Sequence, residues 1–143
     1  MLVHGTCVAL DGVGVLLRGP SGSGKSDLAL RLIDRGAALI ADDQTRLEVG
    51  GGRLIASAPE PIGGRLEVRG LGLVPVASVA TAPLGLVVDL VERQAVERLP
   101  DPAEVSFLDH SVPLLRLWPF AGSAAAQVRL AVGARCRGII APP

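Results

Sequence analysis

The feature that most constrains the fold of this chain is the segment 19–26, which reads Gly-Pro-Ser-Gly-Ser-Gly-Lys-Ser. It follows an apolar run, 13–18, that is typical of a strand, and it precedes 26–35, where apolar residues recur with helical spacing. Gly36 is a typical helix C-cap. A glycine-rich loop between a strand and a helix places backbone N–H groups at the positive end of the helix, where they bind phosphate.

Each residue type in this loop has a chemical role. Glycines let the backbone turn so that successive N–H groups point inward at phosphate oxygens. Lys25 is expected to reach the β- and γ-phosphates of ATP, and the Ser26 hydroxyl is expected to bind magnesium. Lys25 is also the only lysine, because the other 13 of the 14 basic residues are arginine. The alternative, a glycine turn that happens to precede a helix, is disfavoured because strand, motif, helix and lone lysine agree. The predicted nucleotide-binding residues of the loop are Gly19, Pro20, Ser21, Gly22, Ser23, Gly24, Lys25 and Ser26.

The composition limits the partners of this loop. The 143 residues fit one compact domain, 1–143, with a formal net charge of zero, so no overall field draws the chain to nucleic acid or an acidic membrane. The uncharged stretch 70–88 contains glycines and prolines that exclude a membrane-spanning helix, and we expect strands and turns of a buried sheet there. The N terminus does not resemble a signal peptide, which makes the cytoplasm the expected location. Cys7 and Cys136 lack metal-type spacing and are expected to be buried free thiols.

The remaining pattern predicts an α/β fold with a β-rich mixed sheet, one helix after the glycine-rich loop and one C-terminal helix. The first two strands are expected to form a hairpin through an Asp-Gly turn, and a second hairpin is expected around three consecutive glycines, 50–52. The C-terminal helix is expected at 123–132, with Ser123 as N-cap and Gly133 as its stop. Strands are expected at 3–10, 13–18, 37–41, 46–49, 53–57, 66–68, 84–90 and 114–117.

Two adjacent acids follow the predicted strand 37–41. Ligands of α/β sheets bind at the carboxyl ends of strands, so Asp42 and Asp43 are expected to face the glycine-rich loop. One carboxylate would then bind magnesium through water, and the other would accept a proton from a hydroxyl nucleophile. An aspartate pair that only forms a turn is an equally good interpretation of the local sequence.

Two further segments extend this pattern. His4-Gly5 lies on the strand expected to pair with the strand that leads into the loop, and the segment 66–76 reads Leu-Glu-Val-Arg-Gly-Leu-Gly-Leu-Val-Pro-Val. Nucleotide binding in general does not require an Arg-Gly-Leu-Gly run after an acidic residue. With the loop 19–26 and Asp42-Asp43, these segments resemble the catalytic domain of HPr kinase/phosphorylase over nearly the whole chain. The resemblance implies a P-loop kinase-like fold.

The resemblance also implies an activity. It indicates a bacterial serine kinase that uses ATP and Mg²⁺ to phosphorylate HPr, the small carrier protein of the sugar phosphotransferase system, and also the reverse phosphorolysis of phosphoserine. Carried over to this sequence, Lys25 binds phosphate, Ser26 and Glu67 hold magnesium, and Asp43 accepts the proton of the substrate serine. His4 acts beside them, and Arg116 is the nearest match to an active-site arginine.

The chain also departs from the family. Full-length members carry a separate N-terminal domain, whereas His4 lies near the start here, so the sequence resembles a short form. Long members have a proline-glycine-arginine-asparagine loop and a further C-terminal helix, whereas the segment 113–120 here reads Pro-Leu-Leu-Arg-Leu-Trp-Pro-Phe. That loop and helix serve the reverse reaction and subunit contacts in the family. The homo-oligomer implied by the resemblance, a hexamer in the family, therefore remains an expectation.

Other functions stay open at this point. An ATP-binding regulatory sensor that transfers no phosphate is the main alternative, and a plain ATPase or small-molecule kinase is a third. Among the remaining polar and aromatic residues, His110 is expected in an exposed loop. Trp118 and Phe120 are expected to pack in the core rather than form a docking patch. Arg65 and Arg69 fit a solvated strand face at least as well as an acidic partner.

Overall fold

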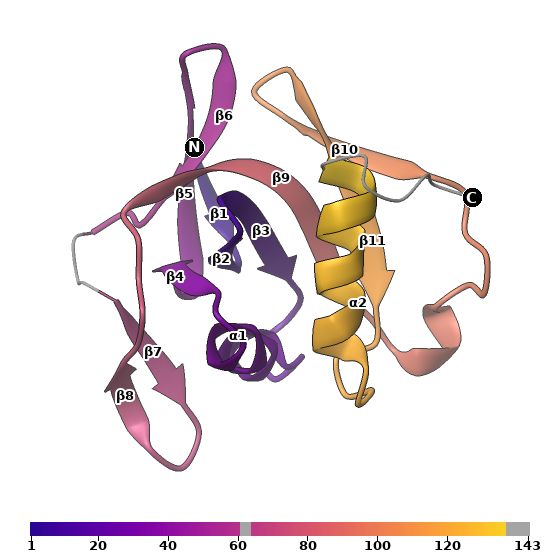
Figure 1. The fold of residues 1–143 in the computed structure, drawn as a ribbon, viewed down its shortest axis with the longest axis horizontal. Coiled ribbons are helices and arrows are strands. Elements are labelled where there is room, and N and C mark those ends of the chain that lie inside the picture. Colours follow the sequence, from indigo (N-terminus) through magenta and orange to yellow (C-terminus); the bar gives the residue numbers. More distant parts are fainter. Residues whose placement is uncertain (61–63, 137–143) are drawn as a thin grey trace.

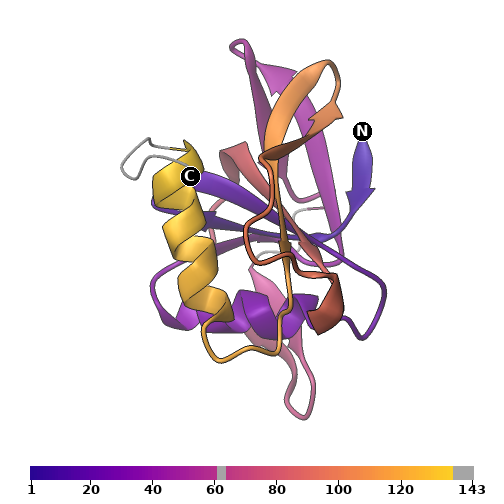
Figure 2. The same cartoon turned by 90° about the vertical axis from the view of Figure 1, so that its right-hand side faces the viewer.

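Most of the chain forms one strongly curled β-sheet with two helices packed on one of its faces (Figures 1 and 2). The structure is a computed structural model and describes residues 1–60 and 64–136. The helices are α1 (Lys25–Asp34) and α2 (Ala124–Ala131), with a 3-10 turn at Arg93–Ala95 and a π-helical turn at Val132–Cys136. The strands are β1 (Leu2–His4), β2 (Thr6–Leu10), β3 (Val13–Arg18), β4 (Ala38–Ala41), β5 (Gln44–Gly50), β6 (Arg53–Ser57), β7 (Arg65–Val68), β8 (Gly72–Pro75), β9 (Thr81–Leu90), β10 (Ala103–Phe107) and β11 (His110–Leu117).

The long strand β9 holds the two halves of the sheet together. Its start pairs antiparallel with β6, and its later part pairs parallel with β3 on one side and with β11 on the other. The sheet order is β1-β5-β6-β9-β3-β2-β4, with β11 also beside β9 and β10 beside β11. The predicted mixed α/β architecture with a helix after the glycine-rich loop and a C-terminal helix is therefore confirmed at this level.

Strands β2 and β3 are buried on both faces, which explains their nearly continuous apolar sequences. On the helix face, Val8 and Leu17 pack with α1 and α2 in one apolar cluster. On the opposite face, Cys7 and Leu16 pack with β5, β6, β10 and β11 in a second cluster. The free thiol of Cys7 is buried as expected, and burial raises its pKa to about 12 although a backbone hydrogen bond from Val15 opposes the shift. The side chain of Cys136 lies outside the described residues.

The predicted strand 3–10 is wrong in one respect, because it divides at Gly5. β1 pairs with β5, where His4 is opposite Gln44, while β2 pairs with β3 and β4. A Cβ atom at Gly5 would lie 2.8 Å from the carbonyl oxygen of Leu17 and 2.9 Å from a methyl carbon of Leu16. Only glycine therefore permits this close approach, and His4 lies on β1 rather than on the strand that pairs with β3.

The middle of the chain contains two hairpins. The β5–β6 hairpin is as expected, with Gly51 and Gly52 both at positive φ in its two-residue turn. The β7–β8 hairpin is a separate two-stranded sheet that projects away from the main sheet (Figure 1). The expectation that 70–88 lies in a buried sheet is thus wrong for β8, where Leu73 is exposed, and correct for most of β9. Within the described ranges, no helix is long and apolar enough to cross a bilayer.

The C-terminal third differs most from expectation. β10 was not predicted, and β11 begins at His110 rather than at residue 114. His110 is consequently a half-buried strand residue, not part of an exposed loop. The backbone continues past Gly133 in the π-helical turn, so Gly133 does not end the helix. At the start of α2, the Ser123 hydroxyl accepts a hydrogen bond from Gln127 Nε2 instead of capping the helix.

Candidate active site

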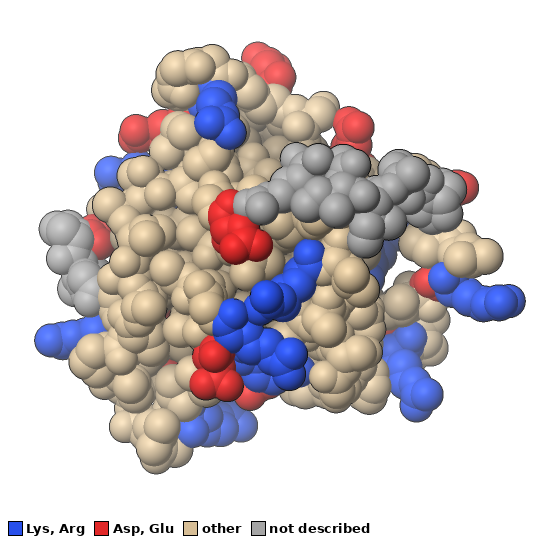
Figure 3. Space-filling view, in the orientation of Figure 1, with Lys and Arg blue, Asp and Glu red and all other residues tan. Residues whose placement is uncertain are grey.

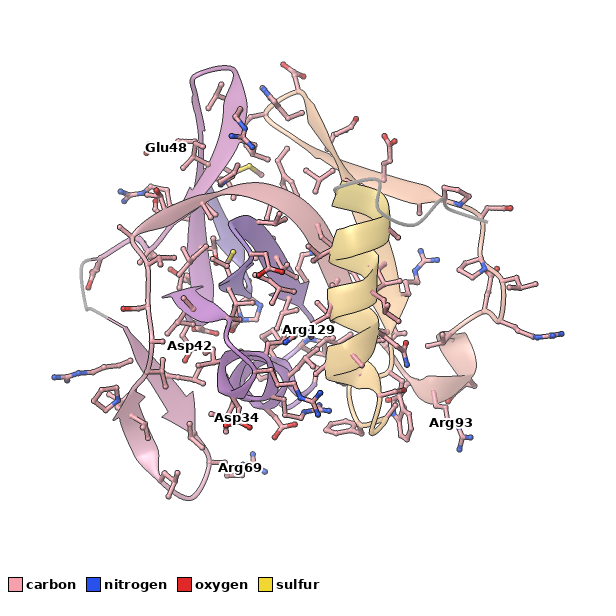
Figure 4. All side chains as sticks on the ribbon, in the orientation of Figure 1. Asp34, Asp42, Glu48, Arg69, Arg93 and Arg129 are labelled. Carbon is pink, nitrogen blue, oxygen red and sulfur yellow. The ribbon has the colours of Figure 1, made fainter. Side chains whose placement is uncertain are left out.

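The glycine-rich loop and the aspartate pair lie at the same edge of the sheet. β3 and β4 are both antiparallel to β2, so their carboxyl ends point the same way. The loop 19–26 leaves β3 at this edge, and Asp42-Asp43 leave β4 there. Figure 4 shows Asp42 between β4 and α1. The expected juxtaposition is confirmed.

The loop backbone adopts a conformation that depends on glycine. Gly22 and Gly24 have φ angles of 81° and 100°, which other residues rarely adopt. A Cβ atom at Gly19 would lie 2.5 Å from Ser23 Oγ. The loop is closed by a hydrogen bond of 3.0 Å from the Ser23 amide to the Pro20 carbonyl. Together these contacts place the loop amides at the start of α1, where an anion is favoured.

Lys25 is folded back over the loop that precedes it. Its side chain is nearly buried, at 8% exposed, and its Nζ donates to the carbonyls of Gly19 at 2.7 Å and Pro20 at 3.1 Å. Two carbonyls partly offset the cost of burying an ammonium group. A third N–H direction remains for a phosphate oxygen in the cleft that Lys25 lines.

Asp42 is the centre of a polar network beside the loop. Its Oδ1 accepts hydrogen bonds from Thr6 Oγ1 at 3.0 Å and from Ser26 Oγ at 3.3 Å. Its Oδ2 accepts one from the backbone N–H of Glu67 at 3.1 Å. One carboxylate thus connects β2, α1 and β7.

Asp43 is held differently and stays accessible. Its Oδ1 lies 3.0 Å from His4 Nε2, and the side chains of His4 and Asp43 are 52% and 72% exposed. The Asp43 backbone has a positive φ of 68° in a tight turn, which the Gln44 amide closes by donating to the Asp42 carbonyl at 2.8 Å. The aspartate pair therefore forms a turn, as the simpler interpretation expected, and it also exposes the Asp43 carboxylate to solvent.

A cleft of about 860 Å³ runs along these groups. Its lining includes the acids Asp42, Asp43 and Glu67 and the tip of the β7–β8 hairpin at Arg69. From the glycine-rich loop it includes Ser21, Gly22, Gly24, Lys25 and Ser26. The structure does not bring Arg116 to this cleft. Arg116 lies on β11 opposite Asp89 and lines a separate hollow of about 50 Å³. The position of Arg116 therefore does not support its assignment as the active-site arginine.

The residues of the cleft fit a nucleotide with a divalent cation. Glycines with positive φ leave room for a phosphate beside the backbone, and Lys25 and the α1 N-terminus complement its charge. Within residues 1–60 and 64–136, no three His, Cys, Asp or Glu side chains gather into a metal site of their own. Magnesium commonly uses one or two carboxylates, a hydroxyl, water and phosphate oxygens. Ser26, Asp42 and Glu67 line the cleft and could hold such an ion.

Thr6 and Phe120 line the cleft although the sequence analysis did not place them there. Thr6 is fully buried, lines the cleft and contacts both aspartates, since its Oγ1 also accepts the Asp43 amide at 3.3 Å. A threonine inside an apolar strand was the available signal, because buried hydroxyls need partners. Phe120 is 58% exposed and lines the cleft, which contradicts the expected core position. Trp118 is half buried.

Residues 1–128 match the family model described as the HPr Serine kinase C-terminal domain. The chain belongs to this family. The family resemblance expected from His4, the loop, the aspartate pair and the 66–76 segment is thereby confirmed.

Two relatives and one solved structure illustrate the family likeness. The chain is 39% identical over 127 residues to HPr kinase/phosphorylase of Caldanaerobacter subterraneus subsp. tengcongensis, which covers 80% of this chain and 42% of the relative. It is 48% identical over 77 residues to HPr kinase/phosphorylase of Clostridium tetani, covering 54% of this chain and 25% of the relative. The chain thus spans less than half the length of these relatives. The structure of the Hpr(Ser) kinase/phosphatase from Coxiella burnetii superposes with a TM-score of 0.81 at 26% identity, covering 97% of this chain and 91% of that one.

Proposed function

We propose that this chain is a P-loop kinase that transfers the γ-phosphate of ATP to a serine hydroxyl of the phosphocarrier protein HPr. The observation that carries the proposal is the position of Asp43. Its accessible carboxylate lines the same cleft as the glycine-rich loop, and His4 Nε2 holds it at 3.0 Å. A protein kinase needs a base that an incoming hydroxyl can reach beside a bound triphosphate.

The transfer step uses these groups in a simple order. The serine oxygen of the acceptor forms a bond to the γ-phosphorus, and the bond from that phosphorus to the β,γ-bridging oxygen breaks. The serine proton passes to the Asp43 carboxylate, and ADP leaves. His4 fixes the orientation of Asp43 through the Nε2 contact. Most of the acceleration would come from this positioning.

Charge on the transferring group is neutralised from the loop side. The Lys25 ammonium and the loop amides lie at the N-terminus of α1, where they would face the phosphate oxygens of bound ATP. Magnesium, bound through Ser26, Asp42 and Glu67, would supply further positive charge to the phosphate oxygens. Asp42 is arranged for this role because Thr6 and Ser26 both donate to its Oδ1.

Three further expectations belong to the same proposal. The reverse reaction would have inorganic phosphate attack phosphoserine and release serine and pyrophosphate in the same cleft. The chain would act in the cytoplasm, where ATP and HPr are found together. Copies of the chain would assemble into a homo-oligomer, which sedimentation velocity measures directly.

Mass spectrometry of HPr after incubation with this protein, ATP and Mg²⁺ tests the kinase activity. We expect a mass increase of one phosphate, located on a serine. Unmodified HPr, with its folded state checked by circular dichroism, would overturn the proposal.

An Asp43→Asn variant separates the kinase from an ATP-binding sensor. Loss of a general base slows a reaction by roughly 10²- to 10⁴-fold, so phosphate transfer should nearly vanish while ATP affinity is kept. Asp34→Asn is the matched control, since Asp34 is an exposed acid on α1 outside the cleft (Figure 4). If Asp43→Asn behaved like the control in transfer, Asp43 would not be the base. If it kept the wild-type cellular effect without transferring phosphate, the sensor function would be favoured.

A further inference from the structure

An exposed aromatic ring lies against the glycine-rich loop. The chain has only two phenylalanines, and the other one, Phe107, is 5% exposed in the core. Phe120 is 58% exposed and lines the cleft together with Lys25 and Ser26. A large apolar side chain left open beside a polar site costs solvation free energy, so it suggests a ligand that covers it.

The ring is held in place by the loop itself. A Cβ atom at Gly24 would lie 3.3 Å from two ring carbons of Phe120 and 3.3 Å from Pro119. The ring therefore packs directly on the backbone of the residue that precedes Lys25. Trp118 meets Phe120 edge to face, with ring centres 6.3 Å apart and an angle of 76° between the rings.

The turn that carries Phe120 is fastened to α1. The Arg31 guanidinium donates to the carbonyl oxygens of Pro119 and Ala121, on both sides of Phe120. Figures 1 and 2 both show this turn, which precedes α2, beside α1. The position of the ring is thus set by two elements and not by a free loop.

The turn also lies at the correct edge of the sheet. β11 is parallel to β9, and β9 is parallel to β3, so the carboxyl end of β11 points the same way as the end of β3 that leads into the loop. The acids Asp42, Asp43 and Glu67 line the same cleft, and the proposed function uses them for the acceptor and the cation. The nucleobase is a flat group attached to the other end of the triphosphate. Among the described residues that line the cleft, Phe120 is the aromatic one on which such a group could stack.

We propose that Phe120 is the platform on which the nucleobase of ATP stacks. The inference rests on the proposed function, because it assumes a nucleoside triphosphate in the loop, and it adds a base-binding residue to it. Stacking on an aromatic side chain tolerates any base, since every base has a π-face. Phe120 would strengthen binding of the nucleotide without contributing to binding of the phosphates.

Binding of two probes to the Phe120→Ala variant tests this assignment. Isothermal titration calorimetry with ATP and Mg²⁺ should give a dissociation constant about tenfold higher than wild type, from the loss of base stacking. Inorganic tripolyphosphate, which has no base, should bind both proteins equally. Leu130→Ala is the matched control, because Leu130 is 60% exposed on α2 outside the cleft, and it should change neither constant.

If the alanine substitution weakens folding, two other replacements of Phe120, one aromatic and one aliphatic, keep the test valid. Phe120→Trp should retain the affinity for ATP. Phe120→Leu still fills the space over Gly24, but it should lose most of the preference for ATP over tripolyphosphate. Equal affinity of wild type, Phe120→Ala and Phe120→Leu for ATP would overturn the platform. A parallel loss of ATP and tripolyphosphate binding would also overturn it, because Phe120 would then only support the loop.

The two proposals fail in different ways. If ATP binding depends on Phe120 but HPr gains no phosphate, the stacking proposal is supported and the kinase proposal is contradicted. If wild type and Phe120→Ala both phosphorylate HPr with the same KM for ATP, the kinase proposal is supported and the stacking proposal is contradicted.

Discussion

Thr6 Oγ1 donates a 3.0 Å hydrogen bond to Asp42 Oδ1 and accepts one of 3.3 Å from the Asp43 amide. This single buried hydroxyl therefore orients one aspartate by its side chain and the next by its backbone. Thr6 lies on β2, between β3, which leads into the loop, and β4, which leads into the acids. The strand between the two halves of the site thus sets the distance between them.

A Thr6→Val variant should slow phosphate transfer to HPr by roughly tenfold or more while ATP affinity changes little. Valine has nearly the same shape, but it leaves Asp42 Oδ1 and the Asp43 amide each short of a partner, at a cost of about 1–3 kcal/mol. Steady-state kinetics measures the effect, and thermal denaturation checks the fold. Thr6→Ser should restore the rate because it keeps the hydroxyl. Wild-type kinetics in Thr6→Val would show that the hydroxyl has no role in positioning.

Removing the Lys25 ammonium should weaken ATP binding by roughly 10- to 100-fold, the range for hydrogen bonds to a charged group. Lys25→Arg should be nearly as weak as Lys25→Ala, because a planar fork cannot enter the space under the Gly19 and Pro20 carbonyls as a compact ammonium does. Calorimetric titration with ATP and Mg²⁺ gives the constants. Arg35→Ala, at an exposed cation beyond α1, is the control. Unchanged affinity in Lys25→Ala would mean that nucleotide binds elsewhere.

A Gly5→Ala substitution should destabilise the fold by about 1–3 kcal/mol, the usual cost of overpacking a buried site. The new methyl group would lie 2.8 Å from the Leu17 carbonyl oxygen, so backbone must move. Urea denaturation measures the change. Gly122→Ala is the matched control, since nothing lies within 4 Å of its Cβ position, and it should be neutral or slightly stabilising. Equal stability of the two variants would contradict the tight contact at Gly5.

The buried thiol of Cys7 should make stability fall in alkaline solution. Burial raises its pKa from 9.0 to about 12, so the unfolded chain loses this proton at lower pH than the folded protein. The contribution is fully present below about pH 9 and is lost as pH rises toward 12. Urea midpoints for wild type and Cys7→Ala between pH 8 and 11 test this expectation. The wild type should decline more steeply, and parallel curves would show that the thiol is not the titrating group.

The elements around the glycine-rich loop were predictable because their signals are local. Helix α1 begins at Lys25, one residue before its expected start, and β6 has the bounds that were predicted. β10 was missed although Ala103, Val105 and Phe107 alternate with polar residues, a pattern typical of a half-buried strand. The β7–β8 hairpin has apolar residues that suggest burial, yet the sequence alone does not reveal that it stands off the main sheet.

The site was predictable in its acids and its loop, and less so in its supporting residues. Asp42 and Asp43 follow directly on an apolar strand, so their place at the sheet edge followed from the chain order. The bend at Gly5 depends on contact with Leu16 and Leu17 of another strand, which no local pattern reports. Phe120 was assigned to the core because aromatic residues usually pack there, whereas its position follows from a contact with Gly24 across the fold.

The central place of β9 has a consequence for how the protein is made. The strand that leads into the glycine-rich loop acquires its parallel neighbour only when Gly14 pairs with Leu84, far along the chain. During synthesis, the edge of β3 that pairs with β9 therefore remains without a partner until most of the polypeptide has left the ribosome. We expect the nascent chain to gain nucleotide binding late, and to need protection from aggregation until then.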